Sequence, residues 1–243
     1  DFANAFGDSF EKYIGKFAFS VLQPEVYTIL PERPYHVGTE LKHGTDWIIS
    51  DTTGHLFIEC KTKRLVHNAK LLEEDDSLTA ELTILAQAGL QMYKNLDDAL
   101  SGLTDWDSLD LPCFPMIVTL EDWIIFSPSV RDQFKALLRS ALIGNRNLQE
   151  LSDRFPLTIA SCQEFEELVI VVRSCGLNTF FTKVREPKYD NWMLSAFMAT
   201  AFSEVPRRDK MAAWERWREL IARFTAKWDV KYQNSLLEIS EGY

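Results

Sequence analysis

Three charged residues, Asp46, Glu59 and Lys61, lie on two neighbouring segments whose alternating apolar and polar residues predict a β-hairpin. If the turn pairs Ser50 with His55, counting back along both strands places Asp46 opposite Glu59. Directly opposed residues have Cβ atoms roughly 4.5 to 5.5 Å apart, so both carboxylates can reach one hard cation. Lys61 follows Glu59 by two residues and therefore lies on the same face of the hairpin.

This set of residues is typical of metal-assisted phosphodiester chemistry. Two carboxylates and an ammonium group on one face carry a cost in repulsion and desolvation unless something offsets it. A Mg²⁺ ion would remove the repulsion, polarise a phosphodiester and lower the pKa of a bound water. Lys61 would position that water or help to deprotonate it, and would stabilise the negative charge that develops as the phosphorus is attacked.

The surrounding sequence predicts the elements that must position these residues. Apolar residues at steps of three and four predict a helix over residues 4–22, and the pattern from Leu78 to Leu96 predicts another after the hairpin. The remaining expectations are an extended segment at 35–41, a loop at 101–112, strands at 114–120, 123–126 and 157–160, helices at 129–143 and 161–175, and helical structure beyond Pro187, broken near Pro206. This order predicts an α/β fold with a small mixed sheet flanked by helices and a C-terminal helical extension.

The hairpin resembles the active-site region of the PD-(D/E)XK phosphodiesterase superfamily, which contains many restriction endonucleases, junction resolvases and DNA-repair nucleases. In that family an Asp at the start of the second core strand and a Glu-x-Lys on the third form the active site. Asp46 and Glu59-Cys60-Lys61 match these positions, and Thr45 stands where the family name has Pro. The resemblance covers approximately residues 4–126 and implies a restriction-endonuclease-like core.

We therefore expect two parts of the chain. Residues 1–185 would form the nuclease-like domain, with its central mixed sheet flanked by helices. Residues 186–243 would form a helical extension packed on that domain. Because the chain begins at Asp1 rather than Met, we also expect an upstream segment that the sequence does not include.

Glu11 is a fourth candidate for the site. Many members of the superfamily carry a Glu in the first core helix that contributes to the metal site, and Glu11 matches it. Gly7, Glu11 and Gly15 fall at steps of four on one helix face, and each helical glycine costs about 0.5 to 1 kcal/mol relative to Ala. These glycines indicate that something approaches the face closely, either the sheet edge with Asp46 or other packing. The alternative is that Glu11 is an exposed helix residue.

Four further residues are candidates for substrate contacts. Lys63 and Arg64 directly follow the hairpin and could hold a phosphate, although as surface charges they are unremarkable. Gln87 lies on the next helix, where the family often places a Gln or Lys near the metal, and its alternative is an ordinary polar helix face. His43 precedes Asp46 by three residues and could carry a proton or contact substrate, since His titrates near neutrality.

Composition and missing motifs exclude several other classes. No apolar run approaches the roughly 18 residues of a membrane span. The sequence lacks Gly-x-Ser-x-Gly, Gly-x-x-x-x-Gly-Lys and Gly-x-Gly-x-x-Gly, which argues against serine hydrolases, P-loop hydrolases and dinucleotide enzymes. The cysteines lack a CxxC spacing and favour buried thiols in a reducing, cytoplasmic setting over a zinc or disulfide framework; they are Cys60, Cys113, Cys162 and Cys175.

The net charge of −10 makes the chain a poor non-specific binder of polyanions, so a nucleic-acid contact must use local basic patches. Residues 207–231 form one such patch, an amphipathic basic segment with tryptophans. It could clamp a nucleic-acid backbone, dock a second subunit or pack its apolar stripe on the core. A basic partner or an oligomer could also deliver the substrate to an otherwise acidic domain.

The sequence therefore predicts an endonuclease that depends on Mg²⁺, with Mn²⁺ as a substitute. Asp46, Glu59 and Glu11 would be the metal ligands, and Lys61 the cation that positions water. DNA is the preferred substrate over RNA, and restriction, antiviral defence or repair is the role that the resemblance implies. A protein partner or homo-oligomer is expected. The alternatives are an RNA-cleaving member and a catalytically silent module of the same fold that acts in protein–protein assembly.

Overall fold

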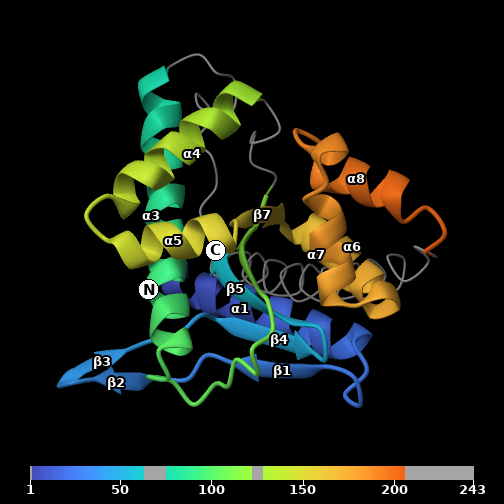
Figure 1. Cartoon of the computed structure of the whole chain (residues 1–243), viewed down its shortest axis with the longest axis horizontal. Helices are drawn as coiled ribbons and strands as arrows, with labels where there is room; N and C mark the ends of the chain where they lie inside the picture. The colour runs from blue at the N-terminus through green and yellow to red at the C-terminus, as the bar shows by residue number, and fades with distance from the viewer. Residues whose placement is uncertain (1, 63–74, 122–127, 206–243) are drawn as a thin grey trace, which may run out of the picture. The chain divides into compact units, whose positions relative to one another are not determined.

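A five-stranded mixed sheet lies at the centre of the computed structural model, which describes residues 2–62, 75–121 and 128–205 (Figure 1). The chain divides into two compact units, Asp1–Val205 and Pro206–Tyr243, and the sheet belongs to the first. The strand order is β1-β4-β5-β6-β7. These strands are β1 (Thr28–Pro31), β4 (Trp47–Asp51), β5 (Gly54–Lys61), β6 (Cys113–Thr119) and β7 (Thr158–Ser161).

Neighbouring strands β1, β4 and β5 pair antiparallel, whereas β6 pairs parallel to β5, and β7 parallel to β6. The described helices are α1 (Phe2–Val21), α3 (Asp75–Leu100), α4 (Pro128–Leu142), α5 (Arg146–Arg154), α6 (Cys162–Cys175), α7 (Leu177–Val184), the 3-10 helix η1 (Pro187–Tyr189) and α8 (Leu194–Ala201). The predicted α/β fold, a mixed sheet flanked by helices, is confirmed.

Side chains alternate along β5, and this alternation assigns one helical layer to each face of the sheet. Phe57 packs with buried residues of α3, α4 and α5, in a cluster that includes Leu82, Tyr93 and Phe134. Leu56 and Ile58 point to the other face, which α1 covers. Burying each large apolar side chain contributes roughly 1.5 to 3 kcal/mol, so both helical layers hold β5 at the centre of the core.

The predicted hairpin register is confirmed, because Ser50 pairs with His55 and Trp47 with Ile58. The carboxylate of Asp51 closes the turn: its Oδ1 accepts hydrogen bonds from the backbone N–H of Thr53 at 2.6 Å and of Gly54 at 3.0 Å. Position 54 requires glycine, since a Cβ there would lie 2.6 Å from the ring of Phe114. The register of β4 and β5 is thus fixed at the turn.

Most predicted elements are present with small shifts at their ends. The helices expected at 4–22, 78–96, 129–143 and 161–175 correspond to α1, α3, α4 and α6, and the strands at 114–120 and 157–160 to β6 and β7. The extended segment at 35–41 is instead two short strands, β2 (Tyr35–Val37) and β3 (Glu40–Lys42), which pair antiparallel. Gly38 allows their turn with a φ of 62°.

Three elements are not predicted by the sequence pattern, and one prediction is too broad. β1 is short and ends in proline, α5 is largely polar, and α7 begins directly after Gly176 at the end of α6. The expectation of continuous helix beyond Pro187 is wrong between η1 and α8, where residues 190–193 are not helical. The predicted strand at 123–126 and the segment 206–243 lie outside the described residues.

The part of the predicted extension that the structure describes, residues 186–205, packs through α8 on α6. Phe197 of α8 is buried and lies edge-to-face against Phe180 of α7, with ring centroids 5.6 Å apart. The boundary at 185 stays a prediction. Among the described residues, no helix combines the length and apolar character needed to cross a membrane. All four cysteines are free thiols, and Cys60 and Cys113 are buried.

Candidate active site

Asp46, Glu59 and Lys61 meet at the end of the hairpin opposite its turn. Asp46 directly precedes β4, one position beyond the Trp47–Ile58 pair, and so lies opposite Glu59. The backbone N–H of Cys60 donates to Oδ2 of Asp46 at 2.6 Å, and Nζ of Lys61 donates to Oε1 of Glu59 at 2.7 Å. The structure therefore brings together the three residues that the sequence singles out.

Of the two Glu59 carboxylate oxygens, one accepts a hydrogen bond and the other has no partner in the described part of the chain. Its side chain is only 10% exposed. Oε1 accepts from Lys61, whereas Oε2 is buried and has no hydrogen-bond partner among the described residues. A buried oxygen of this kind carries a desolvation cost that a cation or an ordered water would offset.

The pKa values of both Asp46 and Lys61 are raised by their surroundings. Burial, then the charge of Glu59, raise the pKa of Asp46 to about 7, although the hydrogen bond from Cys60 opposes the rise. Burial alone would lower the pKa of Lys61, but the carboxylates of Glu59 and Asp46 outweigh it and raise that pKa. Lys61 is therefore an ammonium cation at neutral pH.

Lys61 is only partly exposed. Its side chain is 37% exposed and is paired with a carboxylate that is largely buried. Lys61 is therefore not an isolated surface charge. Removing its ammonium group would leave Glu59 without a countercharge, so a substitution at this position has a structural consequence as well as a chemical one.

Glu11 lies close enough to the hairpin to affect its electrostatics. Burial, then the charges of Asp8 and Glu32, raise the pKa of Glu11, while Lys61 lowers it. Within the described residues the Glu11 carboxylate makes no hydrogen bond to the other three site residues. Glu11 thus stands beside the Asp46–Glu59 pair rather than joined to it.

Trp47 connects α1 to the site. Its indole N–H donates to the backbone carbonyl of Glu11 at 2.9 Å. A Cβ on Gly15 would overlap the Trp47 ring, so glycine is required there for the helix to reach the hairpin. A Cβ on Gly7 would meet nothing within 4 Å. The close approach predicted for this helix face is present at Gly15 and absent at Gly7.

Glu32 is a residue of this region that sequence reasoning missed. Its backbone N–H donates to the carbonyl of Asp46 at 2.8 Å, because β1 pairs with β4 and continues the ladder by one step. Its Oε1 lies 2.7 Å from Nδ1 of His43. His43 therefore contacts Glu32 at the exposed rim of the site. The signal that could reveal Glu32 is the short apolar run Thr28–Pro31, which is compatible with a strand.

The other predicted substrate residues are not joined to the site in the described structure. Gln87 is exposed on α3 and makes no hydrogen bond with a described residue. Gln91, one turn further along, donates to Asn95 on the same helix at 2.9 Å. Lys63 and Arg64 lie outside the described residues, so their predicted roles stay predictions.

The carboxylates of Asp46 and Glu59 fit a cation that is held by few protein ligands. Within residues 2–62, 75–121 and 128–205, no group of three or more His, Cys, Asp or Glu side chains is arranged to hold a metal ion. Mg²⁺ is commonly bound by one or two carboxylates with water and phosphate oxygens completing its shell. The opposed Asp46 and Glu59 and the partnerless Oε2 fit that pattern, and do not form an all-protein cage.

No protein-family model and no curated protein matches this sequence. The chain is similar in structure to the small subunit of a heterodimeric restriction endonuclease, with 12% sequence identity and a TM-score of 0.31. That alignment covers 87% of this chain and 88% of the other.

Proposed function

We propose that this chain hydrolyses phosphodiester bonds of nucleic acid as an endonuclease, with a divalent cation, Mg²⁺ or Mn²⁺, held by Asp46 and Glu59. The observation that carries the proposal is the buried Oε2 of Glu59, which lacks a partner among the described residues and stands opposite a second carboxylate. The strand order around it supports the proposal, since Asp46 directly precedes β4, the second strand in the order β1-β4-β5, and Glu59 lies on the third.

Each residue has a distinct part in the proposed reaction. The cation, when bound, supplies Lewis acidity to the phosphodiester and lowers the pKa of a bound water. Asp46 and Glu59 supply the anionic oxygens, and the N–H of Cys60 orients the Asp46 carboxylate. Lys61 offers its charge to the phosphate oxygens as negative charge develops. Because its pKa is raised, Lys61 acts as a cation at neutral pH rather than as the base. Glu11 is proposed as an auxiliary ligand.

The test measures cleavage of supercoiled plasmid, single-stranded DNA and RNA, each with Mg²⁺, Mn²⁺ or EDTA. Wild type is compared with Lys61→Met, which keeps most of the side-chain stem without the charge. We expect cleavage that needs the metal and is lost in the variant. Cleavage that persists in EDTA, or that Lys61→Met leaves unchanged, would contradict the proposal. The three substrates decide between DNA, which we put first, and RNA.

A second candidate function is a catalytically silent module that acts in protein–protein assembly. The observation that favours it is the internal pairing of the site: Lys61 already neutralises Glu59, and Cys60 already binds Asp46. Calorimetry with Mg²⁺ separates the candidates, because a silent module with this pairing would not bind the ion. Restriction, antiviral defence and repair stay predictions from the resemblance, as do a partner or homo-oligomer and a cytoplasmic location.

A further inference from the structure

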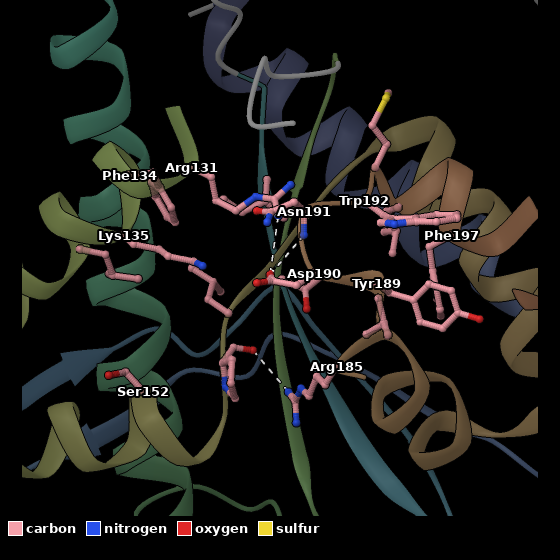
Figure 2. Close-up of a pocket in the computed structure, with 18 of the residues that line it drawn as sticks. Arg131, Phe134, Lys135, Ser152, Arg185, Tyr189, Asp190, Asn191, Trp192 and Phe197 are labelled. Carbon is pink, nitrogen blue, oxygen red and sulfur yellow. Dashed lines mark hydrogen bonds and ion pairs between the residues drawn. The ribbon is translucent and has the colours of Figure 1, made fainter. Parts of the chain in front are cut away.

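A cleft of about 620 Å³ lies between α4, α5, β7 and the segment that leads from α7 into α8 (Figure 2). Its lining combines cationic, aromatic and apolar side chains from elements far apart in the sequence. Figure 2 shows Arg131 and Lys135 extending from α4 toward Asp190, with Arg185 entering from another side. None of the proposed active-site residues lines this cleft.

The cleft carries positive charge on an otherwise acidic chain. Arg131, Lys135 and Arg139 line it at steps of four along α4, so they form a row on one helix face. Successive members are about 6 Å apart along the helix axis, a spacing comparable to that of successive phosphates along a nucleic-acid strand. Four basic residues and three acidic ones line the cleft, compared with a chain net charge of −10.

Two of the acidic residues in the cleft form hydrogen bonds or ion pairs with described residues, whereas two of the basic residues do not. Asp190 lies 4.0 Å from Arg131, whose guanidinium also donates to Asn191 at 3.0 Å. Glu164 accepts the backbone N–H groups of Ser161 and Ser195. By contrast, Lys135 and Arg139 are exposed and make no hydrogen bond or ion pair with any described residue. Their ammonium and guanidinium groups are available to an anion.

Arg185 adds a third cation without an acidic partner in the described structure. Its guanidinium donates to the carbonyl of Pro156 at 3.4 Å and lies 5.3 Å from the ring centre of Phe114. Desolvation by the cleft wall lowers its pKa, yet an arginine stays charged at neutral pH. A bound phosphate would offset this charge with the paired geometry that guanidinium favours.

An exposed aromatic ring stands at the same cleft. Trp192 is 43% exposed. Its ring is held edge-to-face by Tyr189 at 5.5 Å, and Tyr189 packs in turn on Phe197 at 4.8 Å. A tryptophan that is held in place but remains accessible can stack on a nucleobase, and such stacking needs a base that is not already stacked in a duplex.

The cleft reaches the end of β6, next to Lys61 at the end of β5. Thr119 and Ser161 both line it, and they are register partners at the ends of β6 and β7. Thr119 is also the register partner of Lys61. Neighbouring strands lie about 4.8 Å apart, so the backbone of the cleft wall begins within about 10 Å of the Lys61 backbone. The cleft and Lys61 therefore lie at neighbouring strand ends.

We propose that this cleft binds a single-stranded segment of the nucleic-acid substrate, with phosphates on Lys135, Arg139 and Arg185 and a base stacked on Trp192. The proposal rests on the proposed nuclease function for the identity of the substrate and adds where its unpaired strand lies. It names single-stranded nucleic acid, or a single-stranded stretch beside a duplex, as the preferred ligand.

The test is fluorescence anisotropy of a fluorescein-labelled oligonucleotide in EDTA, so that neither metal nor cleavage is required. Single-stranded and duplex forms of equal length are compared. The double variant Lys135→Glu/Arg139→Glu is expected to weaken binding at least 10-fold. Its matched control is Lys16→Glu/Lys94→Glu, which reverses two exposed lysines of α1 and α3 outside the cleft lining and should change binding less than 3-fold.

Two further variants test the assigned contacts. Trp192→Ala should weaken single-strand binding about 10-fold, and Trp192→Phe should restore most of it, since phenylalanine still stacks. Lys135→Ala should reduce the slope of log Kd against log salt by about 0.7, the contribution of one phosphate contact on a single strand. A merely structural effect would not change that slope.

The outcomes separate this proposal from the nuclease function. Three results would overturn the cleft proposal, whatever the cleavage assay shows. The first is that wild type does not bind the oligonucleotide, and the second is that both double variants weaken binding equally. The third is a preference for duplex that Trp192→Ala leaves unchanged. Cleft-dependent binding by a protein that cleaves nothing would support the cleft and contradict the nuclease function.

Discussion

The indole of Trp47 donates a hydrogen bond to the backbone carbonyl of Glu11 at 2.9 Å, and this contact joins the first helix to the residue next to Asp46. The ring also fills the space that a side chain at position 15 would need. One aromatic residue therefore sets how far Glu11 lies from the carboxylate pair, and packing around Trp47 is as important to the proposed site as the charged residues.

Gly15→Ala should destabilise the protein by about 2 kcal/mol or more. The added methyl group would overlap the Trp47 ring, so α1 or the ring must move, and overpacking of this kind typically costs about 1 to 3 kcal/mol. Chemical denaturation measures the loss. If Glu11 assists the cation, metal-dependent cleavage should fall as well, since the helix that carries it is displaced.

Gly7→Ala is the matched control on the same helix. A methyl group there meets nothing within 4 Å, and alanine is the better helix former by about 1 kcal/mol. This variant should be as stable as wild type or more stable. Equal destabilisation by both substitutions would show that Trp47 does not determine the effect at Gly15.

Lys61→Met should lower the rate of cleavage by about 100-fold to 1000-fold, the usual effect of removing one preorganised electrostatic group. It should also cost on the order of 1 kcal/mol of stability, because Glu59 loses its countercharge while the pair remains partly solvated. Kinetics and denaturation on the same preparation measure both. Lys61→Arg, which keeps the charge, should retain most of the stability even if its activity falls.

Asp46→Asn should stabilise the protein increasingly as pH rises. The pKa of Asp46 is about 7 in the folded chain and 3.8 in its ordinary state, so between these values the folded state binds the extra proton. Stability from this group is therefore full below about pH 4 and is lost as pH rises through 7. Asparagine removes that loss. The free energy of unfolding of Asp46→Asn should therefore exceed that of wild type by on the order of 2 to 4 kcal/mol at pH 8.

Denaturation curves of wild type and Asp46→Asn from pH 4 to pH 8, without divalent cations, measure this difference. Asp105→Asn, at an exposed loop residue, serves as the control substitution. A constant difference between wild type and Asp46→Asn across the range would mean that Asp46 titrates normally in the folded protein.

Mg²⁺ should raise the melting temperature of wild type and have little effect on Glu59→Gln. A ligand at 100 times its Kd adds about 2.7 kcal/mol of stability, which corresponds to roughly 5 to 10 °C for a chain of this size. Thermal scans with increasing Mg²⁺, supported by calorimetry, measure the shift. Glu32→Gln, which leaves the proposed ligands Asp46, Glu59 and Glu11 intact, should respond like wild type. Identical responses of wild type and Glu59→Gln would remove Glu59 from the metal site.

The hairpin can be predicted from the sequence because its register depends on local features. Alternation over residues 47–51 and 55–60, together with a glycine turn, is enough to place Ser50 against His55 and hence Asp46 against Glu59. The pairing of Glu32 with the Asp46 backbone is not accessible in this way. It depends on β1, whose four residues show no clear alternation and end at Pro31.

The cleft illustrates a second limit of sequence reasoning. Lys135 and Arg139 lie on α4, Arg185 follows α7 and Trp192 precedes α8, so only the tertiary fold gathers them. The exposure of Lys61 depends similarly on contacts that no local pattern contains, since a residue at a strand end can face either solvent or a neighbouring carboxylate. Chemical identity is readable from the sequence, whereas burial and pairing between distant segments are not.

Asp51 gives the hairpin an unexpected dependence on the C-terminal half of the chain. Besides closing its own turn, its carboxylate accepts the backbone N–H of Leu177 at 2.8 Å, across 126 residues of sequence. Contacts of such long separation form late in folding, because the intervening loop must first lose its entropy. During synthesis the carboxylate pair would emerge from the ribosome long before α7 does. A growing chain would therefore acquire its fully anchored hairpin only after Leu177 had been made.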